Sequence, residues 1–138
     1  MDLGHWILAE GLKIEENSFG FVYNIKNKSS GKEYIGKKQF KHKVKKKPLK
    51  GKKRKRIDNK ESDWKDYTGS SNDLNEDIKK YGKNNFEFII IKICNSKWEL
   101  SYEEIKEQIK RDVLLSEKFY NGIINVRIGR PPKKMVNL

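Results

Sequence analysis

The chain has 138 residues, a length typical of a single domain, and 37% of them are charged while 35% are hydrophobic. Its formal charge of +13 favours a polyanionic partner, and its single cysteine excludes an intramolecular disulfide. No apolar run approaches the roughly 20 residues that a membrane span needs, and the N-terminus lacks the pattern of a secretory signal. These properties indicate a globular protein of a reducing compartment.

The first elements are expected to form a β-hairpin that follows an N-terminal extension over residues 1–18. Apolar and polar residues alternate over 19–26, which is typical of a strand with one buried face. Residues 27–31 are turn formers that end in a glycine, and residues 33–37 would return antiparallel.

The positive charge is concentrated in the segment that follows this hairpin. Residues 41–60 hold twelve Lys or Arg and one Asp, a net charge of +11, which leaves +2 for the rest of the chain. The segment has too little apolar content to bury a core and too much like charge to fold alone. We therefore predict a mobile basic loop inserted in the domain. Its nucleic-acid-binding residues would be Lys41, Lys43, Lys45, Lys46, Lys47, Lys50, Lys52, Lys53 and Lys55.

Beyond this loop the pattern predicts a helix, a strand and a second helix. Residues 72–81 have helical periodicity and end at Gly82, and residues 86–94 are the most apolar stretch, typical of a central strand. The second helix is expected to begin at Ser101. Its predicted buried stripe is Tyr102, Ile105, Ile109 and Val113. The domain would then span residues 19–130, and residues 131–138 would form a flexible tail.

Two tyrosines on the predicted hairpin form a recognisable motif. Ten residues separate Tyr23 from Tyr34, and the second tyrosine begins the sequence Tyr-Ile-Gly. The matching downstream features, in chain order, are the segment 63–71 (DWKDYTGSS), the Tyr81-Gly82 turn, Glu104 and Tyr120-Asn121. This ordered set resembles the GIY-YIG endonuclease family, and segment 63–71 resembles its phage-type members.

The resemblance implies a fold and a function. The fold would be α/β, with a small three-stranded antiparallel sheet flanked by helices and the long basic loop inserted after the second strand. The protein would be a metal-dependent DNA endonuclease of the homing or phage type, which hydrolyses phosphodiester bonds with Mg²⁺ or Mn²⁺. Its partner would be DNA and not a membrane, and its location would be the bacterial cytoplasm if a phage encodes it.

The resemblance also implies roles for individual residues. Tyr23 would help to activate the attacking water, and Tyr34 would belong to the same network. A phenol has a pKa near 10, so cations such as Lys37 and the metal ion would have to lower it. Glu104 would be the sole carboxylate ligand, which suits Mg²⁺ because that ion keeps several waters. Asn121 would orient the phosphate or the waters of the metal.

The chain departs from the family pattern at the phosphate clamp. The family places an arginine, and often a histidine, on the element after the second motif. Here no arginine follows Gly36 until Arg54, and the one nearby histidine is His42. Arg54, Arg56 or a lysine such as Lys43 would have to take this role. The first motif departs as well, because Phe21 stands where the family usually has glycine.

Each of these residues also has a purely structural explanation. Tyr23 and Tyr34 are residue types that favour sheets, and Tyr67 is expected to pack in the core. Ser101 and Glu104 have the spacing of a capping box. Two other functions therefore stay open: a catalytically inactive nucleic-acid-binding module on the same scaffold, and an unrelated basic ribosome-associated protein. Convergence of Tyr23, Tyr34 and Glu104 would favour a nuclease.

Overall fold

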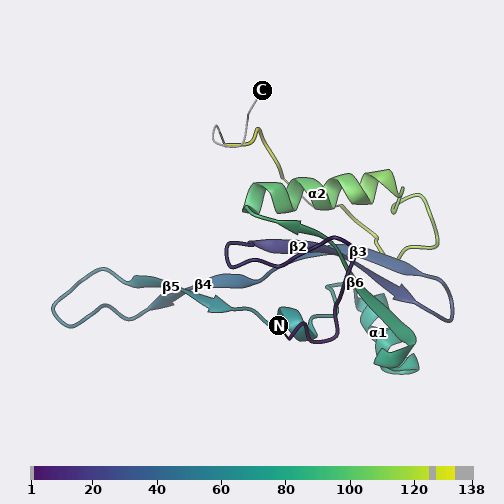
Figure 1. The fold of residues 1–138 in the computed structure, drawn as a ribbon, viewed down its shortest axis with the longest axis horizontal. Helices are drawn as coiled ribbons and strands as arrows, with labels where there is room; N and C mark the ends of the chain where they lie inside the picture. Colours follow the sequence, from purple (N-terminus) through teal and green to yellow (C-terminus); the bar gives the residue numbers. More distant parts are fainter. Residues whose placement is uncertain (1, 125–126, 133–138) are drawn as a thin grey trace.

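The computed structural model describes residues 2–124 and 127–132, and a four-stranded sheet forms its centre (Figure 1). The spatial order of the strands is β1-β6-β2-β3. Their bounds are Ile7–Leu8 for β1, Phe86–Cys94 for β6, Gly20–Asn27 for β2 and Glu33–Gln39 for β3. β1 runs parallel to β6, whereas β2 is antiparallel to both β6 and β3. The predicted hairpin and central strand are confirmed.

The prediction of three strands was wrong because the N-terminal extension supplies a fourth. Ile7 and Leu8 pair with Ile89 and Ile90 of β6. The neighbouring Trp6 is buried in the core, where its indole Nε1 donates a hydrogen bond to the Trp64 carbonyl oxygen. This short strand therefore covers the β6 edge of the sheet and leaves β3 as the other edge.

Two helices cover opposite faces of the sheet, α1 (Asn72–Tyr81) and α2 (Lys97–Lys110) (Figure 1). α1 has its predicted bounds, and Gly82 ends it with a φ of 86°. Leu74 of α1 packs into a core cluster with Phe21 and Ile25, on the face that strand alternation assigns to them. Leu100 of α2 packs against Val22 on the other face. Two short 3₁₀ segments, Trp64–Asp66 and Lys83–Asn85, flank α1 in the chain.

α2 begins four residues before the predicted start. Its N-cap is Ser96, whose hydroxyl accepts a hydrogen bond from the Glu99 backbone N–H at 3.1 Å. Ser101 therefore lies inside the helix, and it cannot form the capping box that the sequence allowed with Glu104.

The face that α2 buries also differs from the prediction. Tyr102 is 46% exposed and Ile109 is 61% exposed, whereas Leu100, Glu104 and Gln108 are buried. These three residues recur every four positions, which places them on one helix face. Of the predicted stripe, Val113 just beyond the helix is buried and Ile105 is half-buried. The prediction for Tyr102 and Ile109 was wrong because two polar residues occupy the inward face.

Residues 41–61 form an antiparallel hairpin and not the expected loop. Its strands are β4 (Lys41–Lys46) and β5 (Arg56–Glu61), and Figure 1 shows it projecting from the body of the protein. The tip contains a turn in which Lys52 N–H donates to the Leu49 carbonyl at 2.8 Å, with Gly51 at a φ of 82°. Cross-strand pairing joins all six residues of β4 to β5, although nearly all of their side chains are exposed. We call it the basic hairpin.

The end of the chain is irregular over residues 121–124 and 127–132. Most of the predicted tail, residues 133–138, lies outside the described residues. No helix in the part of the chain that the structure describes is long and apolar enough to cross a membrane.

Candidate active site

The candidate active site is a pocket of about 290 Å³ at the outer edge of β3, which we call the tyrosine pocket. Because β3 is an edge strand, side chains from both sides of the sheet can meet there. Tyr23 belongs to the core cluster on the α1 side, whereas Glu104 comes from α2 on the other side. The pocket is lined by Tyr23, Tyr34, Lys37, Tyr67, Ser70, Glu104, Gln108 and Ile123.

Gly36 makes room for the first tyrosine. It pairs with Tyr23 across the two strands, and a Cβ atom at position 36 would lie only 2.4 Å from the Tyr23 hydroxyl oxygen. The Tyr23 side chain can therefore reach the edge of the sheet only because residue 36 has no side chain. A second glycine, Gly69, approaches the same hydroxyl from the loop before α1, and its φ of 84° is one that few other residues adopt.

A network of hydroxyl groups joins the tyrosines. The side chains of Tyr23 and Tyr67 interact through their hydroxyl groups, and Tyr67 also interacts with Ser70. The Tyr34 hydroxyl lies 3.0 Å from the Ser70 hydroxyl. Sequence reasoning missed the roles of Tyr67 and Ser70, although both lie in the segment 63–71 that carried the resemblance. The interpretation of Tyr67 as a core residue was incomplete, because only its ring packs against the core.

Burial determines the protonation of these phenols. It raises the pKa of Tyr23 well above 10, and the neighbouring Tyr34 and Tyr67 add to this effect. Burial also raises the pKa values of Tyr34 and Tyr67. The expected lowering by lysines is therefore not produced by the protein's own groups. Tyr23 is a neutral phenol near pH 7, so it can donate one hydrogen bond and accept others.

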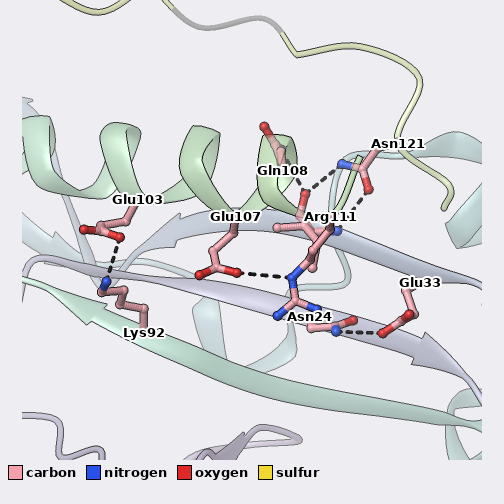
Figure 2. A network of polar contacts seen from close by, with 9 residues as sticks. Asn24, Glu33, Lys92, Glu103, Glu107, Gln108, Arg111 and Asn121 are labelled. Carbon is pink, nitrogen blue, oxygen red and sulfur yellow. Dashed lines mark hydrogen bonds and ion pairs between the residues drawn. The ribbon is translucent and has the colours of Figure 1, made fainter. Parts of the chain in front are cut away.

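Glu104 and Lys37 face each other across the pocket. The Glu104 Oε1 atom lies 3.9 Å from the Lys37 Nζ atom, which also donates a hydrogen bond to Ser101 Oγ at 3.0 Å. Burial raises the pKa of the Glu104 carboxyl, and the nearby Lys37 ammonium partly opposes this rise. The adjacent Glu103 turns away from the pocket and pairs with Lys92 of β6 at 2.7 Å (Figure 2).

Two amide side chains hold the edge strand at the centre of the motif. Asn121 accepts a hydrogen bond from Ile35 N–H at 3.0 Å and donates one to the Ile35 carbonyl at 2.8 Å (Figure 2). Gln108 donates to the same carbonyl at 3.1 Å. Asn121 therefore makes the backbone hydrogen bonds with Ile35 that a neighbouring strand would make. Its expected contact with phosphate stays a prediction.

The clamp candidates lie outside the tyrosine pocket. Arg54 and Arg56 are exposed on the basic hairpin, where the Arg56 Nε atom donates to the Lys47 carbonyl at 3.3 Å. His42 is the second residue of β4 and lines a neighbouring pocket, and Lys43 beside it is exposed. Of the predicted cations, the structure thus brings Lys37 alone into the tyrosine pocket. The nine predicted nucleic-acid-binding lysines all lie on the hairpin.

The oxygen groups of the pocket fit a hydrated divalent ion. Among the described residues no group of three or more His, Cys, Asp or Glu side chains comes together. Within the same residues, Glu104 is the one carboxylate that lines the pocket, and the hydroxyl groups of three tyrosines and Ser70 line it as well. The Gln108 Oε1 atom, one turn further along α2, is buried without a hydrogen-bond partner. Mg²⁺ and Mn²⁺ take such oxygen ligands, and Mg²⁺ keeps several waters.

Comparison with known families agrees with this geometry. Residues 6–124 match the model of the family described as "Putative endonuclease segE, GIY-YIG domain". The chain therefore belongs to the GIY-YIG endonuclease family, and the predicted resemblance is confirmed. Neither the curated proteins nor the solved structures include a match to this chain.

The departure in the first motif has a structural reason. Phe21 is fully buried and its ring packs against Trp6, Phe40 and Trp64, with centroid distances of 5.1, 5.1 and 5.9 Å. The aromatic ring fills space between the sheet and the chain segments that cross it. Phe21 therefore belongs to the core and does not line the tyrosine pocket.

The first prediction concerns Gly36. Replacing it with alanine places a methyl group against the Tyr23 hydroxyl, so the ring must move or the two strands must separate. We expect the free energy of unfolding to fall by about 1–3 kcal/mol, as is typical of overpacking, and nuclease activity to fall with it. Denaturant unfolding and a cleavage assay measure both. Gly129→Ala is the control, because a Cβ atom there meets nothing within 4 Å. Unchanged stability and activity in Gly36→Ala would contradict this account.

The second prediction concerns the stability of Glu104→Gln. Because the pKa of Glu104 is raised by folding, the folded state binds more protons than the unfolded state, and stability falls as pH rises above about 4.5. Gln has no charge to desolvate, so the variant should melt at or above the wild-type temperature at pH 7. The difference should disappear near pH 4. Glu103→Gln should show no such gain, since it loses the ion pair with Lys92. A Glu104→Gln variant that is less stable at pH 7 would refute the burial argument.

Proposed function

We propose that the protein is a DNA endonuclease that depends on Mg²⁺ or Mn²⁺ and acts in the cytoplasm of a bacterial cell, as expected of a phage-encoded enzyme. The observation that supports this most strongly is the convergence of Tyr23, Tyr34, Lys37 and Glu104 on one pocket. A module that only binds nucleic acid has no need of a buried carboxylate beside phenols. Membership in an endonuclease family supports the same proposal.

The residues of the pocket divide the work of phosphodiester hydrolysis. Glu104 would hold the metal ion, which when bound stabilises negative charge on the scissile phosphate and favours ionisation of a bound water. Lys37, which is tied to Ser101 and faces Glu104, would neutralise a second phosphate oxygen. In the absence of a nearby arginine, Lys37 would thus be the phosphate clamp of this chain.

Tyr23 would orient the attacking water as a neutral phenol. Its proton would be shared within the network of Tyr67 and Ser70, and the lone pairs of its oxygen would accept a hydrogen bond from water. Tyr34, linked through Ser70 to the same network, would hold Tyr67 in place or contact the phosphate. This role replaces the phenolate base that the sequence suggested, and it needs no lowered pKa.

The basic hairpin would recruit the DNA. It carries nearly all of the excess charge of the chain, and its strand β5 is exposed along its whole length. Two-stranded ribbons of this kind fit the major groove. Arg54 and Arg56 would contact backbone phosphates there and not at the scissile bond.

The third prediction tests the metal-dependent activity directly. Purified protein should nick supercoiled plasmid when Mg²⁺ is present, and nicking should stop when a chelator is added. Glu104→Gln should abolish nicking and keep DNA binding. Mg²⁺ should also raise the melting temperature of the wild type but not that of Glu104→Gln, because an ion stabilises only the state that binds it. Glu103→Gln is the matched control and should nick normally. Full nicking by Glu104→Gln would exclude the metal role.

The fourth prediction concerns Tyr23→Phe, which removes one hydroxyl and keeps the ring. The single-turnover rate should fall by about 10²- to 10⁴-fold, the usual size of a lost acid–base or water-orienting group. Stability should fall by only about 0.5–1.5 kcal/mol, the net value of one hydrogen bond. Tyr102→Phe, on the outer face of α2, should change neither quantity. A rate loss below about threefold would leave Tyr23 as a structural residue.

The fifth prediction concerns the salt dependence of DNA binding. If about half of the cations of the hairpin contact phosphates, a plot of log affinity against log salt should have a slope near −5. Replacing the basic side chains of the hairpin by Gln and Ser should reduce the slope to about −1 or −2. Lys79→Gln with Lys80→Gln, on α1, is the control and should leave the slope unchanged. At saturating DNA the cleavage rate should return. A rate that stays low would instead assign Arg54 or Arg56 a catalytic contact, and an unchanged slope would contradict recruitment by the hairpin.

A further inference from the structure

A second pocket, of about 460 Å³, lies beside the tyrosine pocket and shares one wall with it. The shared residue is Lys37, which lines both pockets. The second pocket is bounded by the end of β3, by His42 at the root of the basic hairpin and by the first turn of α2. Figure 1 shows that α2 begins on the side of the sheet from which the hairpin projects. The pocket therefore lies between the candidate active site and the hairpin, and we call it the lysine pocket.

The lining of this pocket is positively charged. Lys37, Lys38 and Lys97 line it together with one carboxylate, Asp63. The Asp63 Oδ1 atom already lies 2.6 Å from the Lys38 Nζ atom, so its charge is matched by that lysine. The remaining positive charge would repel a metal ion and attract an anion.

Lys97 is the exposed cation of this lining. It is the first residue of α2, where the helix dipole disfavours positive charge. Among the described residues, no carboxylate lies within ion-pair distance of its ammonium group, whereas Lys37 and Lys38 each have a partner. Lys97 is therefore the lysine of this lining whose charge no carboxylate of the described residues offsets, and a bound anion would offset it.

We propose that the lysine pocket binds the backbone phosphate next to the scissile phosphate on the cleaved DNA strand, with Lys97 as its principal contact. This inference rests on the proposed nuclease function. Lys37 would stand between the two phosphates, and the strand would continue from the pocket towards the basic hairpin. The substrate strand is thereby fixed on one side of the scissile bond by charge.

Binding measurements test this site without any cleavage. In a Glu104→Gln background, Lys97→Gln should weaken binding to a short duplex about three- to tenfold at low salt, and should make the salt slope shallower by about 0.9, the value for one phosphate. Lys110→Gln, an exposed lysine at the other end of α2, is the matched control and should change neither. Since Lys97 opposes the helix dipole, its replacement should not lower the melting temperature. Equal affinities and slopes for the two variants would overturn the proposal.

DNA in which one phosphate is replaced by a neutral analogue shows which phosphate Lys97 contacts. Duplexes that carry a single methylphosphonate near a mapped nick should be cut more slowly by the wild type when the neutral group adjoins the scissile phosphate. The cleavage rate of Lys97→Gln should not change with a methylphosphonate at that position. Methylphosphonates at other positions should slow Lys97→Gln as much as they slow the wild type. If it responds to every position as the wild type does, Lys97 contacts a different part of the DNA and the proposal fails. A wild type that binds DNA but never nicks it would instead refute the nuclease function, while the affinity comparison still decides whether the pocket binds phosphate.

Discussion

The contact between the Tyr23 ring and Gly36 is the constraint on which the site depends. Tyr23 starts from a central strand, and it reaches the sheet edge only by crossing the neighbouring strand at a residue without a side chain. The crossing buries the phenol, and burial keeps it protonated. The same contact that places the hydroxyl in the pocket thus determines its chemistry, because a buried neutral phenol can orient a water and share hydrogen bonds but does not ionise easily.

The edge strand that carries Gly36 needs support, because among the described residues its outer side has no partner strand and pairs only at Glu33, in an isolated bridge to Phe119. Asn121 and Gln108 provide it by binding the backbone of Ile35, in the middle of the motif. Both amides are buried, and Gln108 shares the inward face of α2 with Glu104. The inward face of a helix ordinarily packs apolar side chains, but polar side chains occupy part of this face of α2. The stability lost in this way is the usual consequence of building a site at a packed interface.

These polar positions explain where sequence reasoning succeeded and where it failed. α1 and β6 have the predicted bounds because their apolar patterns and end signals agree with their packing. The buried face of α2 was mispredicted because Glu104 and Gln108 break its apolar periodicity, and a periodicity argument assigns polar residues to solvent. Tyr23, Tyr34 and Glu104 could be named from the motif. Ser70 and Gln108 could not, since their contribution depends on how separate elements meet at the edge of β3.

Under the proposed function, the attraction of DNA and the chemistry performed on it belong to separate parts of the molecule. Within the tyrosine pocket, the negative charge of Glu104 offsets the positive charge of Lys37, so this pocket alone attracts a polyanion only weakly. The hairpin holds the surplus charge on exposed strands that make no core. Because exposed charges act over about 10 Å and are screened by salt, the hairpin would govern the encounter with the proposed DNA substrate. The more buried groups of the pocket are screened less. Salt should therefore weaken capture of the DNA much more than it slows the cleavage of DNA already bound.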